Sequence, residues 1–136
     1  MRARRSMRSL LVWLAIGLAA GCEDPAAVLN AAEQGITVSN QPGHFHITIH
    51  WLDNVIDDTS FTWVSPDSQA KIVHNSLVVH GGGHVNVFDA HGVLVATSPF
   101  VYEADSLSAK GAPGNWTIQF QFLAATGSVD VLVEQP

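Results

Sequence analysis

The histidines are the best candidates for a functional site in this sequence, because an imidazole ring binds transition metals and titrates near neutral pH. The chain has seven histidines among 136 residues. His44 and His46 are two positions apart in a stretch of alternating apolar and polar residues, which puts both rings on one strand face about 7 Å apart. His50 lies four residues further along, too far to join the same ion. His44 and His46 are therefore a candidate metal-binding pair.

A second pair of histidines flanks a run of glycines. If Gly81-Gly82-Gly83 forms a three-residue hairpin loop, His80 and His84 face each other with Cβ atoms about 4.5–5.5 Å apart. Imidazole suits zinc, copper or nickel. The histidine pairs therefore have three interpretations. They form a zinc or copper site, they are solvent-exposed side chains on the outer faces of strands, or they sense protons, because imidazoles titrate near pH 6.5.

Three aspartates, Asp53, Asp57 and Asp58, lie close together in a stretch that we expect to be a loop between strands. Carboxylate oxygens are ligands that calcium accepts. The stretch has neither the glycine nor the glutamate of the EF-hand spacing. A calcium site and an ordinary solvated acidic loop are both compatible with it.

Exposed tryptophan rings would indicate a surface that stacks on sugars. Trp51 and Trp116 fall in register with apolar residues of predicted strands, and Trp63 shares its parity with Phe61. We therefore predict that these tryptophans are in the core. A carbohydrate-binding module would need one of them to be exposed.

Sequence motifs for catalysis are missing. There is no Gly-x-Ser-x-Gly elbow, no His-Glu-x-x-His and no glycine-rich phosphate loop that leads into a helix. We therefore expect a protein that is not an enzyme.

The elements that would position these residues follow an N-terminal leader. An arginine-rich start precedes an apolar run from Leu10 to Ala20, and small residues lead to Cys22. This order is that of an export signal, and Arg4-Arg5 also fits a twin-arginine signal. The run has 11 residues, fewer than the roughly 17–25 of a membrane-spanning helix. We therefore expect no transmembrane protein.

The end of this leader, Leu18-Ala19-Ala20-Gly21-Cys22, resembles the lipobox of bacterial lipoprotein precursors. Ala19 departs from the pattern, because the third residue before the cysteine is usually leucine. The resemblance implies cleavage before Cys22, attachment of lipid (palmitate) to that cysteine, and anchoring to the inner or outer membrane of the bacterial envelope, facing the periplasm or the exterior. Secretory cleavage near Ala20 is the alternative. With Cys22 as the only cysteine, we expect no disulfide.

The rest of the chain is predicted to hold one domain. We expect a signal peptide over residues 1–21, a lipid-anchored spacer over residues 22–35, and a β domain over residues 36–136. The spacer is either a tether or a short helix that Asp24 and Pro25 would begin and Gly35 would end.

Alternating apolar residues between Gly, Pro, Asn, Asp and Ser clusters predict an all-β domain after Gly35. We expect a single antiparallel β-sandwich, immunoglobulin-like or jelly-roll, of about eight strands. A type I turn at Asp89-Ala90-His91-Gly92 should join two of them. The predicted strands are Ile36–Ser39, His44–Leu52, Thr59–Val64, Lys71–His80, His84–Asp89, Gly92–Phe100, Asn115–Phe122 and Ser128–Val133.

The segment Gly111–Gln135 resembles the closing strands of secreted bacterial β-sandwich modules of the pre-peptidase C-terminal or P-domain kind. In those modules too, a glycine-proline turn leads to an aromatic strand, then a turn with glycine, then a valine-rich strand. The resemblance implies the sandwich fold, and no functional residue is transferred from it.

Charge narrows the choice of partners. After Cys22 the chain has two basic residues, Lys71 and Lys110, against all twelve acidic residues, a net charge of −10 with histidine neutral. Such a surface repels phosphate backbones, which excludes nucleic acid.

We therefore expect a membrane-anchored envelope lipoprotein whose sandwich is a non-catalytic binding or assembly module for an envelope protein or glycan. The alternatives are a periplasmic transition-metal-binding protein and a carbohydrate-binding module. An assembly module needs an exposed apolar patch away from the anchor, for which Val78 and Phe88 are candidates.

Overall fold

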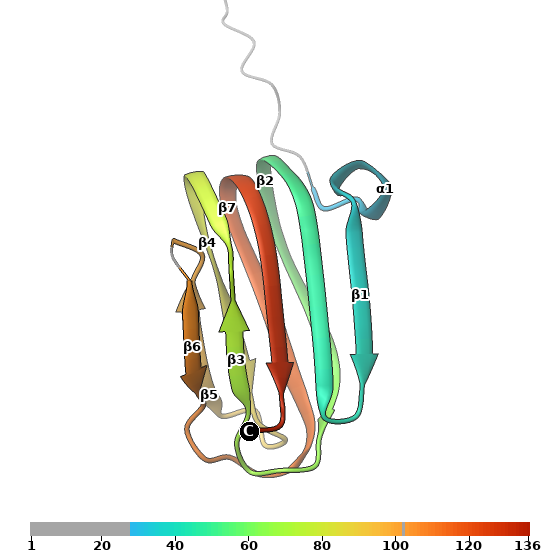
Figure 1. Cartoon of the computed structure of the whole chain (residues 1–136), viewed down its shortest axis with the longest axis vertical. Helices are drawn as coiled ribbons and strands as arrows, with labels where there is room; N and C mark the ends of the chain where they lie inside the picture. The colour runs from blue at the N-terminus through green and yellow to red at the C-terminus, as the bar shows by residue number, and fades with distance from the viewer. Residues whose placement is uncertain (1–27, 102) are drawn as a thin grey trace, which may run out of the picture.

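The computed structural model describes residues 28–101 and 103–136, and these form an almost purely antiparallel β structure (Figure 1). The leader and the predicted helix start at Asp24 and Pro25 lie outside the described residues, and so does Cys22. Within the described ranges there are one short helix and seven strands. They are α1 (Ala31–Gln34), β1 (Ile36–Gln41), β2 (His44–Ser65), β3 (Lys71–His74), β4 (Leu77–Phe88), β5 (Leu94–Pro99), β6 (Ala104–Leu107) and β7 (Gly114–Glu134).

The strands form two layers, because the long strands β2, β4 and β7 bend at one end of the molecule (Figure 1). In the first layer, the first half of β2 lies between β1 and the second half of β7, and β3 and β6 follow. In the second layer, the other halves of β2 and β7 pair with each other, and β4 and β5 follow. The sheet does not close into a barrel, and the predicted all-β sandwich is confirmed.

The core lies between the two layers and follows the predicted alternation along most of each strand. Phe45 of the first layer meets Phe120 of the second, with ring centroids 6.3 Å apart. In the two predicted strands near the C-terminus, the alternate apolar residues are all buried: Trp116, Ile118, Phe120, Phe122, Val129, Val131 and Val133. Burial of these large apolar side chains is the main force that holds the layers together.

The strand count differs from the predicted eight because the bends do not interrupt the strands. The predicted strands His44–Leu52 and Thr59–Val64 are both part of β2, and two predicted strands likewise merge into β7. The predicted strand Lys71–His80 is instead divided between β3 and β4. β6 was not predicted at all, because its sequence, Ala-Asp-Ser-Leu, lacks apolar alternation.

A β-bulge in β2 reverses the side-chain alternation at the bend. The register to β7 shifts between Ile49 and Leu52, so that Leu52 and Val55 are buried. Trp51 is consequently 67% exposed, and the prediction that it belongs to the core is wrong. Trp63 and Trp116, by contrast, are fully buried as predicted.

The run of three glycines is part of the bend in β4 and is not a hairpin loop. Gly81 has a φ of 69°, and a Cβ at this position would lie 2.0 Å from the carbonyl oxygen of Ala124. Only glycine lets β4 approach β7 this closely. The predicted hairpin register, in which His80 opposes His84, is therefore wrong.

The predicted turn between β4 and β5 is confirmed. Gly92 donates to the carbonyl of Asp89 at 3.0 Å, and Asp89 donates to that of Val93 at 2.9 Å. The Asp89 carboxylate accepts from the backbone N–H groups of Ala112, Val93 and His91. These hydrogen bonds, that from Ala112 first, hold the pKa of Asp89 below its usual value. One carboxylate thus joins the β4–β5 turn to the segment before β7.

The helix α1 lies against β2 and leads into β1. Asn30 caps it, so this helix begins after Asn30 and not at the predicted Asp24 and Pro25. Gly35 ends it in the left-handed region with a φ of 62°, as predicted for this glycine. Just before the helix, the N–H of Leu29 donates to Oδ2 of Asp57 at 2.9 Å. The chain is therefore fastened to the bent end of the sandwich where the described residues begin.

Candidate functional site

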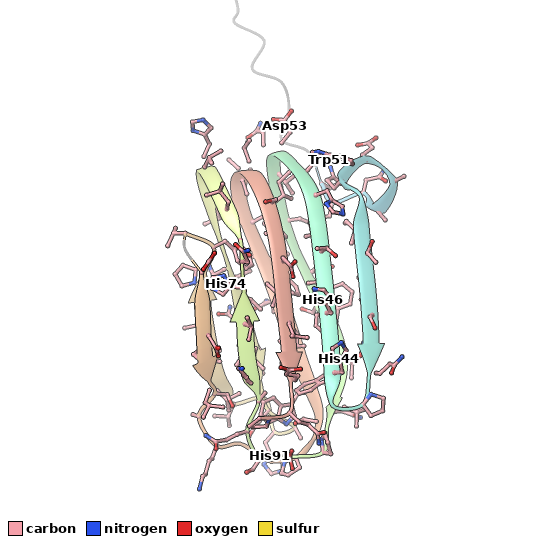
Figure 2. The ribbon with its side chains drawn as sticks, in the orientation of Figure 1. His44, His46, Trp51, Asp53, His74 and His91 are labelled. Carbon is pink, nitrogen blue, oxygen red and sulfur yellow. The ribbon has the colours of Figure 1, made fainter. Side chains whose placement is uncertain are left out.

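His44 and His46 lie on the outer face of the first layer, as the alternation predicts (Figure 2). Nε2 of His46 is 2.7 Å from Oδ1 of Asp130, and Nδ1 of His44 is 3.9 Å from Oε2 of Glu134. Both carboxylates come from the neighbouring strand β7. The two rings therefore contact carboxylates across the strand pair, and such exposed pairs add little stability.

The other predicted histidine pair is not brought together across a hairpin. His80 and His84 are four positions apart on β4 and pair in register with Thr126 and Gln121 of β7. The bend at Gly81 lies between them, so the two rings do not oppose each other as they would across a hairpin. Over the described ranges there is no group of three or more His, Cys, Asp or Glu side chains that could hold a metal. The structure thus brings His44 and His46 to one face and gives no shared zinc or copper site for all four histidines.

The aspartates predicted as calcium ligands lie within β2 and not in a loop. Asp57 accepts from the backbone N–H groups of Leu29 and Asp58. Asp58 accepts from the side-chain amides of Gln119 and Gln121. Asp53 is exposed at the bend. The carboxylates of Asp57 and Asp58 are thus directed to different protein donors and do not converge on one ion.

Asp58 belongs to a strip of polar side chains on the second layer. Nε2 of Gln119 is 3.0 Å from Oδ1 of Asp58, and Nε2 of Gln121 is 3.1 Å from Oδ2. Nδ2 of Asn86 donates to Oε1 of Gln119 at 3.1 Å, which extends the strip to β4. Alternation along β7 turns Gln119 and Gln121 to the outer face, and the register of β2 with β7 brings them to Asp58.

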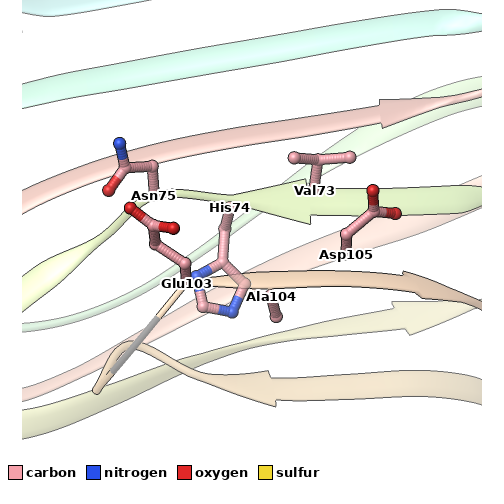
Figure 3. Close-up of a pocket in the computed structure, with 6 residues that line it drawn as sticks. All are labelled: Val73, His74, Asn75, Glu103, Ala104 and Asp105. Carbon is pink, nitrogen blue, oxygen red and sulfur yellow. The ribbon is translucent and has the colours of Figure 1, made fainter.

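His74 is a site residue that the sequence did not single out. It is 1% exposed, its Nε2 lies 2.6 Å from Oγ of Ser98, and its ring meets Phe100 edge-on with centroids 6.0 Å apart. Burial lowers the pKa of His74. Beside it lies an open depression of about 400 Å³ where the paired strands β3 and β6 meet the segments next to them, lined also by Glu103 and Asp105 (Figure 3). His74 is therefore a core histidine next to an acidic depression.

Exposed apolar side chains gather at the bent end of the sandwich, which we call the apolar end. It comprises Trp51 and Ile56 of β2, Leu77 and Val79 of β4, and Leu123 of β7. Figure 2 shows Trp51 near α1 and Asp53 at the tip of the same end.

The predicted patch residues are not among these exposed side chains. Val78 and Phe88 are half-buried, and Val78 packs against the core. The sequence missed the apolar end because the bulge in β2 and the course of β4 decide which side chains are turned outward.

Comparisons with known proteins add little to this geometry. No protein-family model and no curated protein sequence matches the chain. A solved structure of a glycoside hydrolase family 43 arabinoxylan arabinofuranohydrolase from Bacillus subtilis, in complex with cellotetraose, is similar at 20% identity and a TM-score of 0.32. The match covers 74% of this chain and 21% of that chain. A likeness this weak carries no inference about activity or ligand.

In the described ranges, no helix is long and apolar enough to cross a lipid bilayer.

Proposed function

We propose that this chain is a lipid-anchored lipoprotein of the bacterial envelope and that its β-sandwich is a non-catalytic binding or assembly module held close to the membrane. The leader motif Leu18-Ala19-Ala20-Gly21-Cys22 supports the anchor. The observation that carries the proposal is the hydrogen bond from the N–H of Leu29 to Oδ2 of Asp57, which fixes the chain to the bend of β2 seven residues after Cys22.

The distance between anchor and domain is limited by the length of the chain. Val28 is the sixth residue after Cys22. Six residues span at most about 20 Å even when fully extended. The hydrogen bond from Leu29 to Asp57 fastens the chain to the bend of β2. A lipid on Cys22 would therefore be attached within about 20 Å of Val28, next to the bend of β2.

The anchor is tested by following lipid attachment to the full chain in a bacterial host that processes lipoproteins. Radiolabelled palmitate should be incorporated into the protein, which should sediment with membranes. Cys22→Ala should lose both the label and the sedimentation. Trp51→Ala is the matched control, since it changes an exposed residue of the same chain and should keep the label. Absence of label from the unaltered protein would overturn the anchor.

Carbohydrate binding is a second candidate function, because the exposed aromatic residue that it needs is present in Trp51. The Trp51 ring is 67% exposed, and the His50 ring lies 5.6 Å from it. Aromatic faces at a protein surface are suited to stacking on sugar rings. Purified peptidoglycan sacculi would then retain the protein in a co-sedimentation assay, and Trp51→Ala would abolish the retention. Equal retention of both proteins would exclude Trp51 as a sugar platform.

A further inference from the structure

The apolar end exposes five large apolar side chains, each by more than half of its surface. Trp51 is 67% exposed, Leu123 62%, Leu77 61%, Val79 56% and Ile56 51%. Apolar area in water costs about 25 cal/mol per Å². Exposed patches of this kind indicate a contact with another apolar surface.

These side chains come from strand segments that neighbour one another. Within the bend, Val55 of β2 pairs with Ala125 of β7, and Val78 of β4 pairs with Gly127 of β7. Ile56 and Leu123 also line one depression of about 290 Å³. The five apolar side chains therefore belong to one end of the sandwich, although they are far apart in sequence.

The proposed lipid on Cys22 brings the membrane surface close to the apolar end. The described chain starts at Val28, which is 67% exposed, and is fastened to Asp57 in the bend of β2. With Cys22 only six residues earlier, the acyl chains that it would carry are attached within about 20 Å of Val28. Such a tether gives the membrane surface a high effective concentration at this end, so that even a weak contact is populated.

We propose that the apolar end rests in the boundary between headgroups and acyl chains of the membrane that holds Cys22. The sandwich then stands on the bilayer by its bent end, and the β4–β5 turn with His91 points away from it (Figure 2). This inference rests on the proposed lipid anchor and adds a second, non-covalent contact that sets the orientation of the domain.

The residue types fit this location. Tryptophan is enriched where headgroups meet hydrocarbon, because its ring is apolar and its N–H is polar. Asp53, exposed at the tip, and Asp57 and Asp58 of the same bend put carboxylates at headgroup level. Because anionic lipids repel such charges, the contact should favour a zwitterionic surface.

Fluorescence of Trp51 tests the contact. The processed full chain is reconstituted in phosphatidylcholine vesicles with or without bromine atoms on the acyl chains, which quench tryptophans that contact them. Mature protein contains Trp51, Trp63 and Trp116, and the last two are fully buried. We expect emission to fall in brominated vesicles, and Trp51→Phe to abolish most of that loss. Vesicles rich in brominated phosphatidylglycerol should quench less.

A pair of matched variants separates the apolar end from general hydrophobicity. Ile56→Asn with Leu123→Asn should reduce the quenching of Trp51. Val93→Asn with Leu94→Asn changes two residues of similar exposure beside the β4–β5 turn and should leave it unchanged.

The outcomes distinguish failure of this inference from failure of the anchor. Palmitate-labelled, vesicle-bound protein whose Trp51 is not quenched would overturn the membrane contact and leave the anchor standing. A Trp51 signal that responds to peptidoglycan sacculi and not to vesicles would also overturn it, in favour of a glycan. If no palmitate is incorporated, the anchor falls and this inference falls with it.

Discussion

The two ends of the sandwich use tryptophan in opposite ways. At the end with the β4–β5 turn, Trp63 and Trp116 are fully buried and meet edge-on, with ring centroids 5.8 Å apart. Their N–H groups donate to the carbonyls of Gln41 and Ala112 at 3.1 and 2.7 Å. At the apolar end, Trp51 is mostly exposed. The tryptophans of the turn end are therefore buried and hydrogen-bonded within the protein, whereas Trp51 at the apolar end is exposed.

The backbone differs between the ends as well. In the bends of the apolar end, Asn54 of β2 and Ala124 of β7 have positive φ angles of 48° and 50°. A positive φ costs free energy for a residue with a Cβ, and here it occurs where the two strands bend. The opposite end is closed by the hydrogen bonds of Asp89. Internal hydrogen bonds thus close the turn end, and the apolar end carries the membrane contact that we propose.

The largest difference between the two ends should be the loss of stability when a tryptophan is replaced. Trp116→Ala should lower the free energy of unfolding by about 3–5 kcal/mol, because it leaves a cavity in the core. Trp51→Ala should change it by less than about 0.5 kcal/mol, as exposed substitutions do. Urea denaturation measures both. Similar losses for the two variants would show that the ends do not differ in this way.

The next effect concerns the bend of β4. Gly81→Ala should destabilise the fold by about 1–3 kcal/mol or more, since the new Cβ would clash with the Ala124 carbonyl and the φ is positive. Gly82→Ala is the control, because a Cβ there meets nothing within 4 Å. Thermal unfolding followed by circular dichroism compares the two. If both variants unfold at the same temperature, the close approach of β4 to β7 does not contribute to stability.

Acid should weaken the turn end through Asp89. The pKa of this carboxyl is lowered in the folded state, so its stabilising effect is present above the unfolded value of about 4 and is lost as the pH falls through the folded value. Asp89→Asn should therefore be less stable at pH 7 and lose less stability on acidification below pH 4. Urea midpoints measured across this range test it, and parallel curves for both proteins would be the contrary result.

The smallest effect should come from His74, which lies between the ends. Its folded pKa is lowered by burial, so the unfolded chain binds the proton more readily as the pH falls below about 6.5. Stability should decline from pH 7 toward pH 5.5, and His74→Leu should flatten the decline. His80→Ala removes an exposed imidazole as the control. An unchanged slope in His74→Leu would assign the decline to other groups.

Much of the fold could be predicted from alternation alone, because buried faces such as Trp116 to Phe122 keep a strict period of two. The turn at Asp89 was also predictable, since its residue types demand one geometry. Prediction failed at the bends. A bulge after Ile49 turns Trp51 outward, and Gly81 passes close to β7 where a local pattern favours a hairpin.

The candidate site was less predictable than the fold, because it is assembled from three bends that meet only in the folded sheet. Ile56, Val79 and Leu123 are apolar residues, and nothing in their local sequence predicts that they are exposed. Their common exposure depends on the register of β2 and β4 with β7.

The most direct measurement places a spin label at each end of the lipidated protein in phosphatidylcholine vesicles. Ile56→Cys and His91→Cys each supply one free thiol once Cys22 is acylated. We expect the label at position 56 to collide readily with oxygen, which concentrates in lipid, and the label at position 91 to collide with a water-soluble nickel complex. Labels equally accessible to the nickel complex at both ends would contradict the membrane contact.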